Sequence, residues 1–277
     1  MRITILVLVL FFSCQTTFAQ QIDTGENPPY EWNWTRDGIW TGTAMAANGL
    51  GLYFIINKDG ISDAELQSIV ADEDNISGIN RWAAGNSSET AGKISDIPFY
   101  LSFAAPLALF FDDEVNDNSG LVLGIFLETM ATSGAMYTIT AGLVDKSRPY
   151  VYAEDYDYDR RVGASGQRSF FSGHTLMTAT ATFFVAKVYQ DFNPGSSKIP
   201  YFYAGAALLP AAVGFLRIQA GQHFLTDVLI GYGLGALSGY FIPHLHKKRK
   251  HKMSVLPVNG IDFQGKEYTG LSLRYRF

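Results

Sequence analysis

Three stretches place reactive side chains between apolar segments of the chain. They read LRIQAGQHFLTD (216–227), RSFFSGHT (168–175) and DKSRPY (145–150). The first stretch places His223 four residues before Asp227, a spacing at which two side chains share one face of a helix. A carboxylate there accepts one imidazole N–H, fixes the tautomer and leaves the other nitrogen free to attack. A buried His–Asp pair that caps a helix is the alternative interpretation.

The second stretch has the features of an anion site at the start of a helix. Ser172 and Gly173 precede a helix that we expect to begin at His174. Backbone amides at a helix start bind anions, a glycine allows close approach, and a serine hydroxyl adds a donor. A histidine at this place is able to protonate a leaving oxygen. The alternative is an N-cap serine followed by a surface histidine.

Positive charge accompanies both histidines. Arg148 directly precedes Pro149, which disfavours a helical backbone, so the preceding apolar segment should end with this arginine at its rim. Arg217 lies six residues before His223, and a turn at QAGQ would bring its guanidinium to the same pocket. Lys146 and Arg148 are equally suited to capping the C-terminal end of a helix.

Together the three stretches fit a phosphate group. Guanidinium forks bind phosphate oxygens in pairs. In-line phosphoryl transfer needs positive charge around the equatorial oxygens, a nucleophile on one axis and an acid on the other. The sequence shows no acidic cluster beside these residues to hold Mg²⁺, and a zinc site needs more ligands than two histidines. We therefore expect phosphoryl transfer without a metal.

The composition indicates a folded protein with a large core. The chain has 277 residues, of which 47% are hydrophobic and 17% charged, a balance that excludes disorder. The mean hydropathy of +0.05 lies between the values of soluble proteins and of polytopic membrane proteins. The net charge of -5 does not suggest a nucleic-acid partner.

The N-terminus has the pattern of a secretory signal. Arg2 is followed by an apolar run and then by small and polar residues, which predicts cleavage after Ala19. The single cysteine, Cys14, lies inside this segment, so a mature chain would have neither a disulfide framework nor a cysteine metal site.

Apolar or small-residue segments recur along the rest of the chain. They lie at roughly 40–57, 97–111, 119–144, 173–190, 201–216 and 224–243. Most are longer than a strand, so the expected fold class is all-α, a bundle of about six core helices. The tetrapeptide SDIP at 95–98 predicts a helix start, with Ser95 as N-cap ahead of a proline.

The C-terminal tail differs from the bundle. The basic run HLHKKRKHK contains His244, His246 and His251, which we expect to be solvated. MSVLPVNGIDF and YTGLSLRYRF alternate as strands and are able to pair as a hairpin. The chain then divides into a signal peptide (1–19), a polar segment (20–38), a helical domain (39–243) and a basic linker with a strand tail (244–277).

The apolar segments are marginal as membrane spans, which need about 20 mostly apolar residues. Their small residues suit close helix packing in lipid and equally suit a tight soluble bundle. If the basic run is cytoplasmic by the positive-inside rule, all three reactive stretches face the periplasm. With a cleaved signal, five spans from 97–111 onward satisfy this topology. The segment 40–57 must then lie along the interface or pack without crossing.

The three stretches resemble the motifs of the type-2 phosphatidic acid phosphatase superfamily, which includes bacterial acid phosphatases and vanadium haloperoxidases. The family pattern is K-x6-R-P, then P-S-G-H, then S-R-x5-H-x3-D. The matching residues are Arg148, Pro149, Ser172, Gly173, His174, Arg217, His223 and Asp227. Three positions depart from the pattern: Ala141 stands in place of lysine, Phe171 in place of proline and Leu216 in place of serine.

The resemblance implies a role for each matching residue. His223 would attack phosphorus and form a phosphohistidine, and Asp227 would orient it. His174 would protonate the leaving alkoxide and later activate water. The phosphate would be held by Arg148, Ser172, Gly173 and Arg217. Lys146 is an auxiliary candidate for the missing lysine, although on a helix it would lie on another face from Ala141.

The resemblance also implies a metal-independent phosphatase acting on phosphomonoesters or pyrophosphates of lipids, of the phosphatidate, isoprenyl pyrophosphate or lipid A type. Such an enzyme would lie in the membrane of the bacterial cell envelope, with its active site facing the periplasm. The alternatives are a soluble exported acid phosphatase, a vanadium haloperoxidase with vanadate as cofactor, and a catalytically silent binding protein. The missing lysine weakens the haloperoxidase hypothesis most, since a permanently bound vanadate needs every positively charged residue of the motifs.

Overall fold

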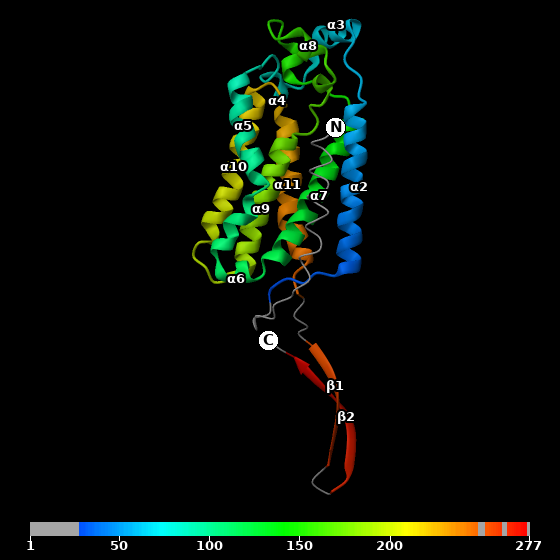
Figure 1. Cartoon of the computed structure of the whole chain (residues 1–277), viewed down its shortest axis with the longest axis vertical. Coiled ribbons are helices and arrows are strands. Elements are labelled where there is room, and N and C mark those ends of the chain that lie inside the picture. Colours follow the sequence, from blue (N-terminus) through cyan, green and yellow to red (C-terminus); the bar gives the residue numbers. More distant parts are fainter. Residues whose placement is uncertain (1–27, 249–252, 262–264, 276–277) are drawn as a thin grey trace, which may run out of the picture. The chain divides into compact units, whose positions relative to one another are not determined.

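The computed structural model describes residues 28–248, 253–261 and 265–275. The chain divides into two units, one ending at His246 and the other beginning at Lys247. The first unit is a helical bundle, so the predicted all-α class is confirmed (Figure 1). The expected signal peptide lies outside the described residues.

Six long helical elements build the first unit within the described residues. They are α2 (Trp34–Ile56), α5 (Glu89–Ser102) with the 3-10 helix η3 (Ala105–Phe111), α7 (Ser119–Leu143), α9 (Gly173–Phe192), α10 (Ile199–Gln219) and α11 (Leu225–Leu245). Each corresponds to one of the apolar segments, and the predicted number is confirmed.

Short helices occupy the polar stretches, where the sequence predicted none. They are α3 (Asp63–Ala71), η2 (Glu73–Asn75), α4 (Gly78–Arg81), α6 (Asp113–Asp117), η4 (Pro149–Tyr152), α8 (Tyr158–Val162) and η5 (Ala164–Gln167). In Figure 1, α3, α4 and α8 lie at one end of the bundle and α6 at the other. We call the end of the bundle that carries α3, α4 and α8 the capped end.

The predicted helix start at Ser95 is wrong. Helix α5 begins at Glu89, and the Ser88 side chain caps it by accepting from the amide of Ala91. Ser95 lies inside the helix and donates its hydroxyl proton to the Gly92 carbonyl at 2.7 Å. The SDIP pattern misled because the capping serine, Ser88, lies about two turns upstream of Ser95. The helix therefore extends through polar residues that hydropathy does not mark.

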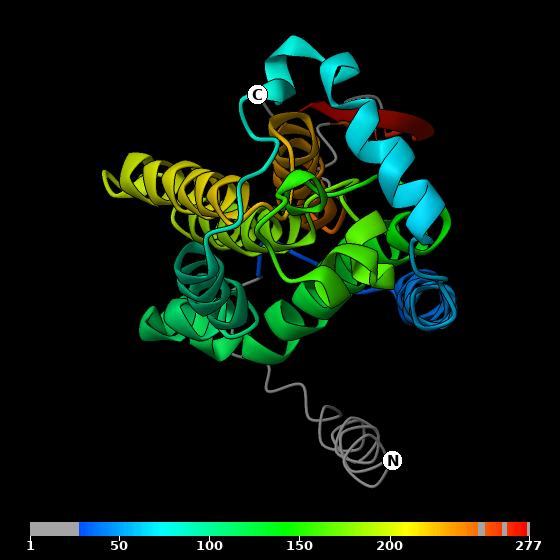
Figure 2. The ribbon, with the colours of Figure 1, turned by 90° about the horizontal axis from the view of Figure 1, so that it is seen from above.

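Helix α2 runs along α7 in the same direction, which excludes one of the two positions expected for 40–57, that along the interface. Thr41 of α2 donates to the Glu128 carboxylate at 3.4 Å, and further along Gly51 lies directly against Thr138. Helix α2 therefore packs lengthwise in the bundle rather than along an interface (Figures 1 and 2). With α2 included, the long elements alternate in direction, and the described chain enters α2 and leaves α11 at the same end.

The long helices suit a membrane. Among the described residues, α2, α7, α10 and α11 are long and apolar enough to cross one, and the bent pair α5–η3 gives a fifth candidate. Helix α9 is mostly buried and contacts α5, α7, α10 and α11. Large apolar side chains are exposed on the outer helices, among them Trp40, Leu208, Phe215, Leu229 and Leu237.

His246 is buried, although the sequence indicated a solvated side chain. Its Nε2 lies 3.2 Å from Oε1 of Glu128, and its Nδ1 lies 3.4 Å from Oδ2 of Asp37. Burial opposes the charged form, but the hydrogen bond and charge of Glu128 and the charge of Asp37 outweigh it and raise the pKa of His246. An imidazolium between two carboxylates thus ties α2, α7 and the end of α11 together. His244 is exposed as expected, and His251 lies outside the described residues.

The second unit is an antiparallel hairpin of β1 (Met253–Ile261) and β2 (Glu267–Tyr275). Its register pairs Met253 with Tyr275 and Ile261 with Glu267. The predicted hairpin is confirmed.

Glycines allow α11 to approach α9 very closely. A Cβ on Gly231 would lie 2.5 Å from the Ser172 carbonyl oxygen, and one on Gly235 would lie 2.3 Å from that of Leu176. Gly239 meets the next turn of α9 in the same way. A stripe of small residues at every fourth position is the usual device for close helix packing in lipid.

We expect Gly235→Ala to lower the thermal midpoint in detergent, because the added methyl group meets a backbone carbonyl that cannot move aside. Overpacking of this kind costs about 1–3 kcal/mol. Gly233→Ala is the matched control, since nothing lies within 4 Å of a Cβ at that position of the same helix. Equal midpoints for the two variants would contradict the close packing of α11 on α9.

Candidate active site

The three reactive stretches converge at the capped end of the bundle, where α10 ends and α9 and α11 begin. The amide of Ser172 donates to the Asp227 carbonyl oxygen at 3.1 Å, which joins the second stretch to the third. The guanidinium groups of Arg148 and Arg217 both donate to Oε1 of Gln222, which joins the first stretch to the third. Residues that are distant in sequence thus surround one site.

His223 lies in the turn between α10 and α11. Gly221 forms this turn with a φ of 67°, a conformation that favours glycine, so the predicted turn at QAGQ is present. The imidazole is 1% exposed, and its Nδ1 lies 2.6 Å from the Ser169 carbonyl oxygen. Because a carbonyl only accepts, Nδ1 carries the proton and Nε2 holds the lone pair. Within the described part of the chain Nε2 makes no hydrogen bond.

The electrostatic surroundings keep His223 neutral. Burial, and then the positive charges of Arg148 and Arg217, hold the pKa of this imidazole well below its usual range. A neutral ring with one nitrogen fixed and the other unprotonated is the state that a nucleophilic histidine needs.

Asp227 does not hydrogen-bond His223 in the structure. Its carboxylate accepts from the Phe224 amide at 3.0 Å, from the Ser169 hydroxyl at 2.7 Å and from the Lys146 ammonium at 2.5 Å. Helix α11 begins only at Leu225, so His223 precedes it and the shared helix face expected from the spacing does not exist. Asp227 is linked to His223 through Ser169, whose hydroxyl donates to Asp227 and whose carbonyl accepts from His223. The role of Asp227 as the orienting residue stays a prediction.

Lys146 is the counterion of Asp227. It follows the end of α7 in an extended segment, not on a helix as the comparison with Ala141 assumed. Its ammonium lies 5.3 Å from the centre of the Phe224 ring, within cation–π range. Because the buried carboxylate neutralises it, Lys146 does not replace the charge of the missing motif lysine.

The arginines are buried and only partly paired. Arg148 donates its Nε to the Arg168 carbonyl at 3.3 Å, and Arg217 donates Nη1 to the hydroxyl of Ser95 at 3.3 Å. The Nε groups of Arg168 and Arg217 are buried without a hydrogen-bond partner in the described chain. Arg168 was not predicted, although it opens the second stretch, because no motif position marks it.

Ser172 and Gly173 form the start of α9, as predicted. The Ser172 hydroxyl lies 2.9 Å from that of Thr175 and caps the helix, which is the structural role that the sequence left open. A Cβ on Gly173 would lie 2.7 Å from the Tyr137 ring, so the glycine is required by packing. Whether these two residues also bind an anion stays a prediction.

His174 faces α5, a contact that the sequence did not indicate. Its Nε2 lies 2.9 Å from Oδ1 of Asp96, and the same oxygen lies 3.3 Å from Nη1 of Arg217. The Phe99 ring stacks on the imidazole with 4.1 Å between ring centres. The only signal in the sequence is an aspartate beside an apolar segment, which is common on solvated helix faces.

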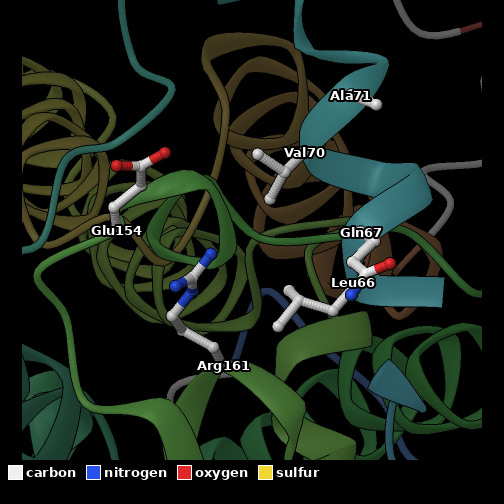
Figure 3. A pocket seen from close by; sticks show the side chains of 6 residues that line it. All are labelled: Leu66, Gln67, Val70, Ala71, Glu154 and Arg161. Atoms are coloured by element: carbon white, nitrogen blue, oxygen red, sulfur yellow. The ribbon is translucent and has the colours of Figure 1, made fainter. Parts of the chain in front are cut away.

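Two surface hollows lie beside the motif residues rather than on them. One, of about 510 Å³, is lined by Leu66, Gln67, Val70, Ala71, Glu154 and Arg161 in the cap (Figure 3). The other, of about 290 Å³, borders Lys146, Tyr152 and Phe224. Neither is lined by His174 or His223.

Within the described chain, the group of side chains close enough to hold a metal ion is Asp37, Glu128 and His246. It lies at the end of the bundle opposite the motif residues. The two carboxylates contact opposite ring nitrogens, which fits an ion-paired imidazolium better than one metal centre. That the site works without metal or cofactor stays a prediction.

Comparison with known proteins identifies relatives. A model of the PAP2 superfamily matches residues 122–251, which include every motif residue. The chain is 23% identical over 145 residues to lipid A 4'-phosphatase of Porphyromonas gingivalis, covering 51% of this chain and 58% of that protein. It is 34% identical over 86 residues to phosphatidylglycerophosphatase B of Bacillus subtilis, covering 30% of this chain and 41% of that protein. The chain thus spans about half the length of these curated relatives.

A solved structure is also similar. It is the first transmembrane PAP2 type phosphatidylglycerolphosphate phosphatase from Bacillus subtilis, with 22% sequence identity and a TM-score of 0.43. The match covers 78% of this chain and 97% of that chain.

We expect Arg217→Ala to weaken the binding of inorganic phosphate more than tenfold in isothermal titration. The reason is that a hydrogen bond to a charged group contributes about 1.5–3 kcal/mol. Lys93→Met should leave this affinity within about twofold, because its exposed ammonium pairs only with the exposed Glu89 carboxylate on the same helix. An equal loss of phosphate affinity in both variants would contradict the assignment of Arg217 to the anion site.

Proposed function

Because a model of the PAP2 superfamily matches residues 122–251, we propose that the chain belongs to this superfamily and is a metal-independent lipid phosphatase working through a phosphohistidine. The observation that carries the proposal is the neutral, buried His223 with a free Nε2 beside Arg148 and Arg217. Both curated relatives are named for phosphorylated lipids, lipid A and phosphatidylglycerophosphate.

The first half-reaction transfers the phosphoryl group to the enzyme. Nε2 of His223 attacks phosphorus in line with the leaving oxygen, while Arg148 and Arg217 balance the charge on the equatorial oxygens. His174 gives its proton to the leaving oxygen, which departs as an alcohol. The Ser169 carbonyl holds the Nδ1 proton of His223 and stabilises the ring as it becomes positive.

The second half-reaction releases phosphate. His174, now neutral, takes a proton from water, and the oxygen of that water attacks the phosphorus of the phosphohistidine. The P–N bond breaks and returns the lone pair to Nε2 of His223. Inorganic phosphate leaves, and both histidines regain their starting protonation.

A lipid phosphate suits the surroundings of the site better than a soluble ester. Asp96 and His174 are the more exposed members, with side chains 41% and 23% exposed. On the same helix as Asp96, Ile97, Tyr100 and Leu101 expose apolar surface on which an acyl or isoprenyl chain can lie. Phosphatidate, isoprenyl pyrophosphate and lipid A fit this description equally. A soluble exported acid phosphatase remains the second candidate.

The haloperoxidase alternative is disfavoured by charge. A permanently bound vanadate needs every cation of the motif, but Ala141 is buried where the family has lysine, and Lys146 is paired with Asp227. A hydrolase holds its oxyanion only transiently and therefore tolerates this loss better.

The protein is a membrane protein, and we propose that its active site faces the periplasm. The basic run follows α11 at the end of the bundle opposite the site. By the positive-inside rule this run stays in the cytoplasm, and the site then faces the periplasm. The described chain enters α2 at the same end as the basic run. Cleavage of the signal after Ala19 would leave the segment before α2 in the periplasm. An active site that faces the periplasm requires instead that this segment stays in the cytoplasm.

Purified protein should release phosphate from lipid phosphomonoesters with EDTA present, because the proposed chemistry uses only side chains. His223→Ala should abolish release, as it removes the nucleophile. His244→Ala, an exposed histidine at the opposite end of the bundle, is the matched control and should retain full activity. Turnover by His223→Ala would reject the mechanism. Bromide oxidation on addition of vanadate would favour the haloperoxidase alternative.

Topology is measurable with single cysteines in a Cys14→Ser background. We expect Asp155→Cys, exposed at the capped end, to react with a membrane-impermeant maleimide on intact cells. Gly195→Cys, exposed between α9 and α10 at the opposite end, should react only after lysis. The reverse pattern would place the active site on the cytoplasmic face.

A further inference from the structure

Helix α5 contributes a carboxylate that no motif contains. Oδ1 of Asp96 lies 2.9 Å from Nε2 of His174 and 3.3 Å from Nη1 of Arg217. The neighbouring Ser95 hydroxyl also accepts from Arg217 at 3.3 Å. One turn further along α5, Phe99 stacks on the His174 ring. Three residues of one helix therefore touch the general acid or the phosphate clamp.

The charges around His174 make this carboxylate significant. Burial, and then the positive charges of Arg217 of α10 and Arg148 before η4, oppose protonation of the ring, and His223 faces it from the turn before α11. Among the described residues that contact His174, Asp96 carries the negative charge. A general acid in a cationic site needs a compensating anion, because it must be protonated before it donates.

Resting on the proposed phosphatase function, we propose that Asp96 is the positioning residue of the general acid. Its carboxylate accepts the Nε2 proton of His174 and so directs Nδ1 at the leaving oxygen. Nδ1 makes no hydrogen bond within the described chain and is free for that transfer. The stacked Phe99 ring restricts rotation of the imidazole about its bond to Cβ.

The proton balance closes through both half-reactions. As the bond between His223 and phosphorus forms and the P–O bond breaks, the Nδ1 proton of the imidazolium moves to the leaving oxygen. His174 then keeps only its Nε2 proton, held by Asp96. Nδ1 next takes a proton from the attacking water, which restores the imidazolium. Asp96 itself stays ionised throughout, since it orients the ring and stabilises its charge.

A competing role is open to Asp96 because it also contacts Arg217. An internal carboxylate that merely occupies the phosphate position would weaken substrate binding without assisting the acid. The two roles differ in what removal of the charge does. Loss of a positioning residue lowers the rate of the step that needs a proton, whereas loss of a competitor tightens the binding of phosphate.

The decisive comparison uses Asp96→Asn and two esters, a short-chain phosphatidate and p-nitrophenyl phosphate. The alkoxide of the first needs a proton to leave, whereas nitrophenolate leaves without one. We expect kcat/KM for the phosphatidate to fall about 10²-fold or more, within the range of general acid catalysis, and for p-nitrophenyl phosphate at least tenfold less. The inhibition constant of inorganic phosphate should change less than about threefold, and Asp96→Glu should recover part of the phosphatidate activity.

Glu89→Gln is the matched control, since it removes one exposed negative charge from the same helix without a contact to the site. It should leave both activities and the thermal midpoint unchanged. An equal loss of kcat/KM on both esters, or tighter phosphate inhibition with kcat retained, would overturn the assignment of Asp96. Failure of the wild-type protein to hydrolyse either ester would instead reject the proposed function.

Discussion

The close approach of α11 to α9 is the constraint on which the site depends. Glycines at every fourth position of α11 let its backbone meet the carbonyls of α9, so the first turns of the two helices lie side by side. At this contact the Ser172 amide bonds the Asp227 carbonyl, and the turn that carries His223 is held against the segment before α9. Helix packing therefore sets the position of the turn that carries His223 relative to His174 at the start of α9.

Charge is distributed unequally within the site. Asp227 is fully buried and is neutralised by Lys146. Arg148 and Arg217 share the neutral Gln222, and in the described part of the chain Arg217 alone contacts a carboxylate, that of the partly exposed Asp96. The site thus retains positive charge in a region of low dielectric, which favours the binding of an anion such as the phosphate of the proposed substrate. Asp96 is the exposed member of this arrangement and so the one that can yield its contact with Arg217 to a substrate.

The sequence predicted the parts of the molecule that depend on local pattern. The six apolar segments, the hairpin and the turn at QAGQ follow from hydropathy, alternation and glycine, and motif order correctly indicated that His174, His223 and the arginines meet. What it missed depends on contacts between distant segments. The burial of His246 by Glu128 and the pairing of His174 with Asp96 leave no local signal.

The error at Asp227 has a different cause. Its spacing from His223 fits a helix, but the helix starts two residues after the histidine, so one misplaced boundary changed the partner of a buried carboxylate. A spacing typical of a helix can thus predict the wrong contact when the helix begins between the two residues.

The buried imidazolium at the opposite end bears on how the bundle is assembled during synthesis. Asp37 and Glu128 belong to α2 and α7 and leave the ribosome well before His246, which follows α11. Until then Glu128 lies in an apolar helix without its cation, a costly state in lipid, and Asp37 pairs with the adjacent, more exposed Arg36. Helix α2 therefore gains its final anchorage only when α11 arrives. The first and last long helices close the bundle together, in a single late event.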